Sequence, residues 1–313
     1  MPTGRSLPMN QGRSARLPAL SALLLAAAFF SGAHAADMSG TLLRTRLPYA
    51  GSARLDAPAL HSSAALVMDA TNSTLLYARR SDVPMPIASI TKLMTALVVM
   101  EAGQPLDETL SITPEDRWPG KGGVSRLLFG THLTRGDLMH LALMASENRA
   151  AHALARNYPG GIEACIAAMN AKAHELGMTT ARFVEPTGLS DENVASAEDL
   201  AKLVIAVAKI PVIREYSTDS YYEVPVGRRV LRFHSTDSLT SKSDWDIIVQ
   251  KTGYISEAGR CLVMQAVFDD RAFVIVLLNS YGKRTRVADA RRVRRWVESH
   301  EQVARATPAP ATT

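Results

Sequence analysis

The pattern of apolar and polar residues divides the chain into a strand-forming start, a helical middle and a strand-forming end. Two short apolar runs, at residues 64–70 and 74–79, are separated by turn-forming residues and predict a β-hairpin. Residues 87–102 then carry apolar side chains at a spacing of three or four. With a proline before it and a glycine after it, this segment is predicted to be a helix.

The middle of the chain is predicted to be helical because its apolar residues repeat with helical spacing. Thr134 and Asp137 resemble a capping box, and Ser196 is followed three residues later by Asp199, so both pairs mark helix starts. Glycine and proline mark the ends. The predicted helices cover residues 134–145, 149–157, 162–176 and 196–209.

The last third again has the pattern of strands. Residues 221–226 and 229–234 flank a turn at Gly227, and three longer apolar runs follow before a basic helix. These runs are residues 247–254, 260–268 and 272–280, and the helix spans residues 286–303.

Strands at both ends of the chain and helices between them predict an α/β fold of the α+β type. Two early and three late strands would form an antiparallel sheet of about five strands, flanked by N- and C-terminal helices. The segment between them, about residues 100–215, would be an inserted all-helical subdomain.

The first residues have the pattern of an export signal. Three arginines, with no acidic residue before Asp37, precede an apolar run at residues 17–30 and an A-x-A cleavage site. The run is shorter than the roughly 20 residues of a membrane span, so we expect cleavage after Ala35 and no stable membrane anchor. The expected divisions are a signal peptide (1–35), a linker (36–60), a single module (61–303) and a disordered tail (304–313).

Charge and composition argue against several classes of protein. Removing residues 1–35 takes away three arginines and no acid, so the net charge falls from +5 to +2, or 32 basic less 30 acidic residues. A net charge of +2 on a chain of this length does not suggest binding to nucleic acid, which usually needs a concentrated basic face. The eight histidines form no H-E-x-x-H or H-x-H pair, so we expect no metal or other cofactor and reject a zinc endopeptidase.

Only two cysteines are present, Cys165 and Cys261, which excludes a disulfide scaffold. They could pair in an oxidising compartment. Because both lie within apolar stretches, we favour two separate buried thiols.

Ser89 and Lys92 stand three residues apart at the head of the first long helix. They therefore lie on one helical face, where the amine can reach the hydroxyl. A lysine acts as a base only if burial or a neighbouring cation lowers its pKa. The same spacing recurs at Ser280 and Lys283, but Gly282 would break a helix there, and we regard it as a chance match.

Two further motifs carry polar groups that could complete a site with this pair. Ser146 and Asn148 fall at the joint between two predicted helices, where they could project into a cleft or cap the second helix. Lys251, Thr252 and Gly253 end an apolar strand. There they would supply a positive charge, a hydroxyl and room for a ligand backbone to approach.

Together and in this order, the three motifs resemble those of the SxxK serine acyltransferases, the superfamily of penicillin-binding proteins and serine β-lactamases. The resemblance covers about residues 64–297. It is strongest to low-molecular-mass D-alanyl-D-alanine peptidases, and among them to the periplasmic penicillin-binding endopeptidases. The stretches that carry it are PIASITKLMTALV, LTRGDLMHLALMASENRAAHALARNYPGG, LGMTTARFVEPTGLS and KTGYISEAGRCLVM.

The resemblance implies a role for each motif position. Ser89 would attack a D-Ala carbonyl, and Lys92 would accept the hydroxyl proton. Ser146 would relay a proton to the leaving amine, and Asn148 would hold Lys92 and the substrate amide.

The strand motif would bind the substrate. Lys251 would keep the site electropositive and help to lower the pKa of Lys92, while Thr252 would bind a substrate carboxylate or amide. The backbone N–H groups of Ser89 and Tyr254 would form an oxyanion hole.

Two further segments differ from the patterns of related enzymes or match them only superficially. Residues 234–238 stand where relatives tend to carry an asparagine pair, which puts the contacts there in doubt. Glu185 superficially matches the deacylating glutamate of class A β-lactamases, but we interpret it as part of a non-catalytic turn.

The implied function is cleavage of D-Ala–diaminopimelate cross-links in peptidoglycan by a periplasmic serine endopeptidase, with β-lactam antibiotics as covalent inhibitors and a role in cell-wall remodelling and cell shape. The main alternative is a carboxypeptidase that trims terminal D-Ala from pentapeptide stems. Relatives of that kind usually carry an extra β-domain and an anchor helix, whereas 60 residues follow Gly253 here. A β-lactamase or a non-enzymatic β-lactam sensor is less favoured, because neither a convincing deacylating glutamate nor a signalling domain is evident.

Overall fold

The computed structural model describes residues 57–120 and 124–306. The predicted signal peptide lies outside the described residues, as do most of the predicted linker and tail. The final helix, α7 (Thr285–Ala306), continues past residue 303, so it takes up the first part of the segment predicted to be a disordered tail.

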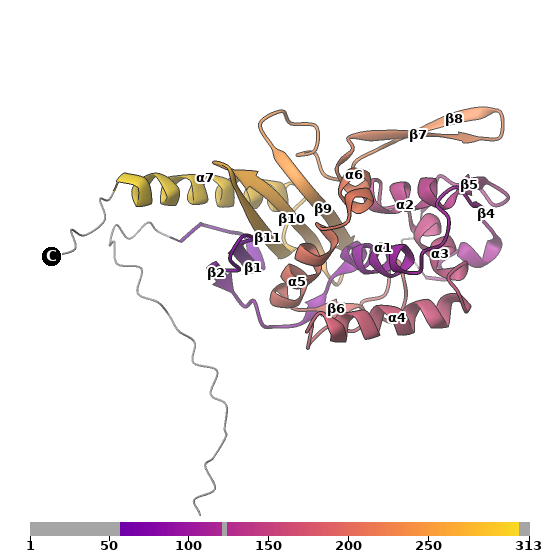
Figure 1. The fold of residues 1–313 in the computed structure, drawn as a ribbon, viewed down its shortest axis with the longest axis horizontal. Coiled ribbons are helices and arrows are strands. Elements are labelled where there is room, and N and C mark those ends of the chain that lie inside the picture. Colours follow the sequence, from indigo (N-terminus) through magenta and orange to yellow (C-terminus); the bar gives the residue numbers. More distant parts are fainter. Residues whose placement is uncertain (1–56, 121–123, 307–313) are drawn as a thin grey trace, which may run out of the picture. The chain divides into compact units, whose positions relative to one another are not determined.

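A five-stranded antiparallel sheet forms the centre of the described unit (Figure 1). Its strand order is β2-β1-β11-β10-β9. The sheet therefore contains the two early and three late strands that the sequence predicted. The first of the described strands pairs with the last, with Leu66 opposite Val276, so early and late segments of the sequence build one sheet. The strands are β1 (Ser62–Asp69), β2 (Leu75–Arg79), β9 (Asp246–Ile255), β10 (Gly259–Phe268) and β11 (Arg271–Ser280).

Alternate residues of the central strands point into two apolar layers, because successive side chains of a strand face opposite sides of the sheet. Ile275 and its alternate neighbours pack with α7, while Val274 and Val276 face the helices on the other side. Both faces of the sheet are therefore covered, and β11 is buried along most of its length.

Helices fill the region between β2 and β9 (Figure 1). Among them, α5 and α6 contact strands of the sheet, and the turn that precedes α1 contacts β9 and β10. Their bounds are α1 (Thr91–Glu101), α2 (Arg135–Met144), α3 (Asn148–Arg156), α4 (Gly161–Glu175), α5 (Ala197–Val207) and α6 (Pro211–Thr218). The predicted capping box is present, since Thr134 and Asp137 exchange side-chain and backbone hydrogen bonds at the start of α2.

The structure differs from the predicted elements in three respects: a 3-10 turn, an additional helix and four short strands. The predicted helix at residues 87–102 opens with a 3-10 turn, η1 (Ala88–Ile90), before α1 begins. Helix α6 was missed because Pro211 was taken as a stop signal, whereas proline is equally suited to the first turn of a helix. The strands β3 (Met85–Pro86), β4 (Thr109–Ser111), β5 (His132–Thr134) and β6 (Val194–Ala195) are too short to show a periodic pattern. The last three lie within residues 100–215, so this subdomain is mostly helical and not all-helical as predicted.

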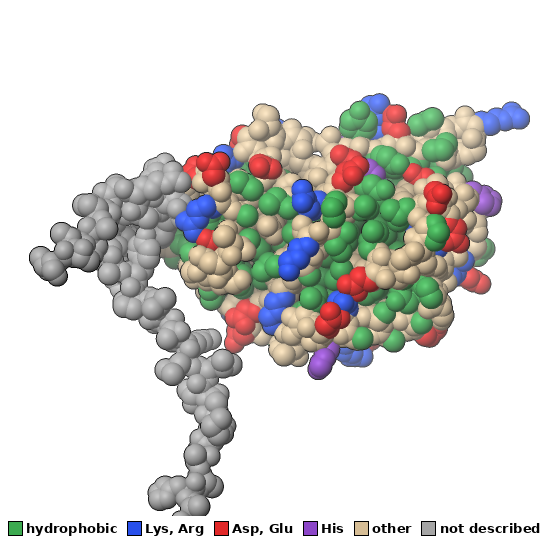
Figure 2. All heavy atoms as spheres, viewed as in Figure 1, with side chains coloured by type: hydrophobic (Ala, Val, Ile, Leu, Met, Phe, Trp, Pro, Cys, Tyr) green, Lys and Arg blue, Asp and Glu red, His purple; other side chains and the backbone are tan. Residues whose placement is uncertain are grey.

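A predicted hairpin, β7 (Tyr221–Val226) and β8 (Arg229–His234), forms a separate two-stranded sheet that extends away from the central sheet (Figure 1). Basic side chains gather at its tip (Figure 2), where Arg228 and Arg229 follow the Gly227 turn.

Both cysteines are buried and free, which confirms the preference for two separate thiols. Within residues 57–120 and 124–306, no helix is both long and apolar enough to span a bilayer.

Candidate active site

Ser89 lies in the 3-10 turn that leads into α1, and this turn contacts strands β9 and β10 of the sheet. Lys92, one turn further on, places its Nζ 2.9 Å from Ser89 Oγ, so the contact expected from the three-residue spacing is present. Both side chains are largely buried. The preceding residue, Ala88, has a φ of 49°, a left-handed conformation that is unfavourable for a residue with a Cβ atom. Thr91 Oγ1 stabilises this turn by donating to the Ala88 carbonyl at 2.8 Å.

Three oxygen atoms surround the amine of Lys92. Besides Ser89 Oγ, they are Asn148 Oδ1 at 2.7 Å and the Thr187 carbonyl oxygen at 2.6 Å. The last two can only accept hydrogen bonds. A neutral amine has two N–H bonds, so donating both to these acceptors leaves its lone pair directed at the Ser89 hydroxyl. The arrangement therefore orients a neutral Lys92 to receive the proton of Ser89.

Burial lowers the pKa of Lys92 to about 8, because the ammonium form loses its hydration. The carboxylates of Glu185 and Glu147 act in the opposite direction. The sequence interpretation gave Lys251 a part in this shift, but burial is the main cause. Lys251 has a lowered pKa of its own, caused first by burial and then by the charges of Lys92 and Arg286.

The second motif joins α2 to α3 and closes one side of the site. Asn148 reaches Lys92 as expected, and Ser146 lies two residues earlier, partly buried and with a φ of 59°. Neither of them caps α3. Instead, Glu147 accepts a hydrogen bond from Arg149 N at 3.3 Å, and the same carboxylate binds the Ser125 hydroxyl. This motif thus combines a contact to the lysine with an anchor for a neighbouring loop.

The third motif lies on β9, the edge strand of the sheet. Lys251 is fully buried, and its Nζ donates to the Thr252 carbonyl at 3.1 Å. The Oγ1 atoms of Thr252 and Thr236 are 2.5 Å apart. Thr236 belongs to the segment whose contacts the sequence left in doubt, and it brings a second hydroxyl to the strand.

Gly253 does not leave space for a ligand, as the sequence interpretation expected. A Cβ atom there would lie 2.8 Å from the Ile87 carbonyl oxygen and 3.2 Å from Ser89 N, so the chain's own backbone fills the space. Arg286, from α7, donates to the Gly253 carbonyl at 2.9 Å. The glycine is required for close packing of β9 against the Ser89 turn.

Gly188 holds the same turn from another direction. Its φ is 81°, and a Cβ atom there would lie only 1.9 Å from the Ala88 carbonyl oxygen. No sequence signal pointed to this contact, because it joins segments 100 residues apart.

Glu185 shapes the loop that presents the Thr187 carbonyl to Lys92. Its carboxylate accepts hydrogen bonds from Thr187 N and Oγ1, both at 2.6 Å, and from Gly188 N at 2.5 Å. It also accepts from Asn193 Nδ2 at 2.8 Å, while Asn193 donates to Thr91 Oγ1 as well. The carboxylate is thus occupied by its own loop, in agreement with its interpretation as part of a turn.

The remaining predicted positions are Tyr254 and the second serine–lysine pair. The Tyr254 side chain is exposed, with the Arg260 guanidinium 4.3 Å from its ring centroid, and its backbone continues the edge strand past Gly253. Ser280, the last residue of β11, places its Oγ 2.6 Å from Ser62 Oγ on β1, and the two hydroxyls join these strands. This agrees with its interpretation as a chance match.

A protein-family model described as D-alanyl-D-alanine carboxypeptidase (peptidase S11) matches residues 52–282. A D-alanyl-D-alanine endopeptidase of Pseudomonas aeruginosa is 45% identical over 247 residues, which are 78% of this chain and 80% of that protein. One of Escherichia coli K12 is 44% identical and covers 77% and 79%. Matched proteins named carboxypeptidases, from Bacillus subtilis and E. coli, are 28% and 27% identical. The fold is that of the Streptomyces K15 DD-transpeptidase, with a TM-score of 0.73 and 24% identity over 78% of this chain and all of that one.

The contacts around Lys92 predict the effect of removing the Glu185 charge. In Glu185→Gln, the negative charge that favours the ammonium form is lost, so the pKa of Lys92 should fall below about 8. Lysine labelled with ¹³C at Cε allows this pKa to be measured by NMR titration, with the Lys92→Arg spectrum assigning the signal. Glu192→Gln, in the same loop but paired with Arg182 at the surface, is the matched control and should leave the titration unchanged. An unchanged or raised pKa in Glu185→Gln would contradict this account.

Proposed function

Because the chain belongs to the peptidase S11 family, described as D-alanyl-D-alanine carboxypeptidases, we propose that it is a serine D-alanyl-D-alanine endopeptidase that cleaves peptide cross-links of peptidoglycan. The observation that carries the reaction type is the Ser89 hydroxyl next to a buried lysine with two other acceptors. The preference for cross-links is supported by identities of 44–45% to proteins named endopeptidases, against 27–28% to carboxypeptidases.

The first step is acylation of the enzyme. Ser89 Oγ attacks the carbonyl carbon of a D-Ala residue, and its proton moves to the neutral amine of Lys92. The new C–O bond forms first, and the C–N bond to the neighbouring stem then breaks. The departing amine takes up a proton, which Ser146 relays from Lys92. An acyl ester on Ser89 and a free amine are the products of this step.

The second step is hydrolysis of the ester. Water attacks the same carbonyl carbon while Lys92, again neutral, accepts a proton from it. Ser89 leaves with a proton, and a carboxylic acid is released. Because Lys92 serves both steps, burial that holds its pKa near neutrality supports the whole cycle.

Stabilisation of the developing oxyanion falls to backbone N–H groups at the joint of the turn and the edge strand. We assign this role to Ser89 and Tyr254, because Gly253 packs the start of η1 against the end of β9. Such donors contribute about 2.7–4 kcal/mol each in comparable enzymes. Thr252 and Lys251 would bind and neutralise a carboxylate or amide of the substrate, with Asn148 holding its peptide group.

A D-Ala carboxypeptidase is the second candidate, favoured by the description of the matching family. A β-lactamase is less favoured, since the Glu185 carboxylate is occupied by its own loop and is not free to activate water. β-Lactams would instead acylate Ser89 and remain there as covalent inhibitors.

Action in the periplasm is part of the proposal. It rests on the charged start, the apolar run and the small residues of the first 35 positions, which have the pattern of an export signal. Peptidoglycan is assembled outside the inner membrane, so cleavage of its cross-links there would remodel the wall and affect cell shape.

Ser89 should form a covalent adduct with benzylpenicillin. Intact-protein mass spectrometry should show one adduct per chain in the parent protein and none in Ser89→Ala. Ser280→Ala, which removes the hydroxyl of the other serine–lysine pair, should keep the adduct. An adduct that persists in Ser89→Ala would refute the assignment of the nucleophile.

Lys92→Arg should acylate at least about 100-fold more slowly, because arginine keeps its charge but cannot accept a proton. The measurement is the rate of benzylpenicillin adduct formation, with Lys202→Arg, at an exposed lysine, as the matched control. A near-native rate in Lys92→Arg would mean that the position supplies charge and not basicity.

Cross-linked substrates should be preferred over terminal ones. Purified protein of residues 36–313 should convert cross-linked muropeptide dimers to monomers faster than it releases D-Ala from pentapeptide monomers, as followed by mass spectrometry. The reverse order of rates would favour the carboxypeptidase alternative.

A further inference from the structure

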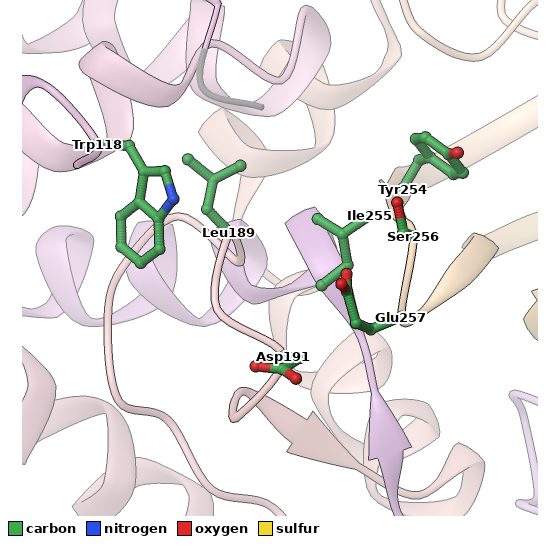
Figure 3. A pocket seen from close by; sticks show the side chains of 7 residues that line it. All are labelled: Trp118, Leu189, Asp191, Tyr254, Ile255, Ser256 and Glu257. Carbon is green, nitrogen blue, oxygen red and sulfur yellow. The ribbon is translucent and has the colours of Figure 1, made fainter. Parts of the chain in front are cut away.

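An open pocket of about 520 Å³ lies at the end of β9 (Figure 3). It is bordered by a loop before α2, by the loop after Gly188 and by the turn between β9 and β10. Its lining includes Trp118, Leu189, Asp191, Tyr254, Ile255 and Glu257.

The pocket adjoins the turn that carries Ser89. Leu189 directly follows Gly188, whose Cα packs against the Ala88 carbonyl. Tyr254 directly follows Gly253, which packs against Ser89 N. Two lining residues are therefore next in sequence to the glycines that hold the nucleophile. When the reacting carbonyl of a peptide lies at Ser89, the side chains of its adjacent residues can reach this pocket.

The chemistry of the lining is amphipathic. Asp191 and Glu257 are exposed, come from different segments, and form no ion pair with a basic residue in the described part of the chain. Apolar surface comes from Leu189, Ile255 and the indole of Trp118, which lies beside Leu189 in Figure 3. An aliphatic arm that ends in a cation matches both kinds of surface, since aliphatic stems pack on apolar walls while their charged ends meet carboxylates.

A second pocket, which shares Tyr254 and Ser256 with the first, is lined by basic residues. It has a volume of about 400 Å³ and includes Arg260 and Lys283, and Tyr254 also lines it. Acidic and basic surfaces thus flank the end of β9. A peptide that carries both a cation and carboxylates would be oriented by such a pair of surfaces.

We propose that the acidic pocket binds the ammonium-bearing side chain of a diamino-acid residue that precedes the D-Ala residue of the substrate. This inference rests on the proposed function. In a cross-link, the diamino acid after D-Ala has its side-chain amine in the scissile amide, so only the preceding residue has a free ammonium group. This ammonium would lie between Asp191 and Glu257, with its aliphatic stem against Trp118 and Leu189.

Two synthetic cross-link peptides test the proposal. In both, a diamino acid precedes D-Ala, and the D-Ala carbonyl is joined by the scissile amide to the side-chain amine of a second diamino acid. The two peptides differ only in the side-chain amine of the first diamino acid, which is free in one and acetylated in the other. The parent protein should cleave the free-amine peptide with a kcat/KM higher by about tenfold, since an exposed ion pair and a cation–π contact each contribute modestly. In the double variant Asp191→Asn with Glu257→Gln, this ratio should fall to about one. Added salt should reduce the ratio in the parent protein. Because the ratio compares the kcat/KM values of two peptides with the same variant, a general loss of activity affects both values and cancels.

Asp246→Asn, which removes an exposed carboxylate at the opposite end of β9, is the matched control and should keep the tenfold ratio. Equal cleavage of the two peptides by the parent protein, or an unchanged ratio in the double variant, would overturn the inference and leave the proposed function intact. Failure to cleave either peptide, together with formation of a penicillin adduct on Ser89, would overturn the endopeptidase function and this inference with it.

Discussion

The site depends on the burial of one amine. Taking the Lys92 ammonium out of water is unfavourable, and this cost lowers the pKa of Lys92 to about 8. The cost is limited because Asn148 and the Thr187 carbonyl both accept hydrogen bonds from the amine. Because the neutral amine donates its two N–H bonds to these acceptors, its lone pair is directed at the Ser89 hydroxyl. Burial and orientation are therefore produced by one set of contacts, contributed by segments far apart in the sequence.

This arrangement requires that the Ser89 turn keeps its position. Ala88 adopts an unfavourable φ, and the turn persists because surrounding backbone fits closely against it. Gly188 and Gly253 pack on it from a loop and from the edge strand, where a side chain would collide. Glu185 holds the first of these segments through five hydrogen-bond donors. A carboxylate that resembled a catalytic group in the sequence thus serves to position another residue's carbonyl.

The central sheet explains why these segments meet. Its edge strand β9 places Lys251 and Gly253 beside the start of α1, and β1 joins the sheet next to β11. The two ends of the module are thereby fixed together, while the segment between them supplies Asn148 from the start of α3 and Thr187 from the loop between α4 and β6. The pocket at the end of β9 arises at the same joint, because the loop after Gly188 and the turn after β9 converge there.

The sequence by itself determined the features that depend on local spacing. Hydrophobic periodicity located the five main strands and most helices, and the three-residue spacing of Ser89 and Lys92 determined their contact. It did not reveal helix α6, because Pro211 is compatible with either an end or a start. Only the tertiary structure decided that Gly253 accommodates the protein's own backbone and that the Thr187 carbonyl faces Lys92. Such contacts involve backbone atoms, which every residue has, and their partners are set by packing across long separations, so no pattern of side chains encodes them directly.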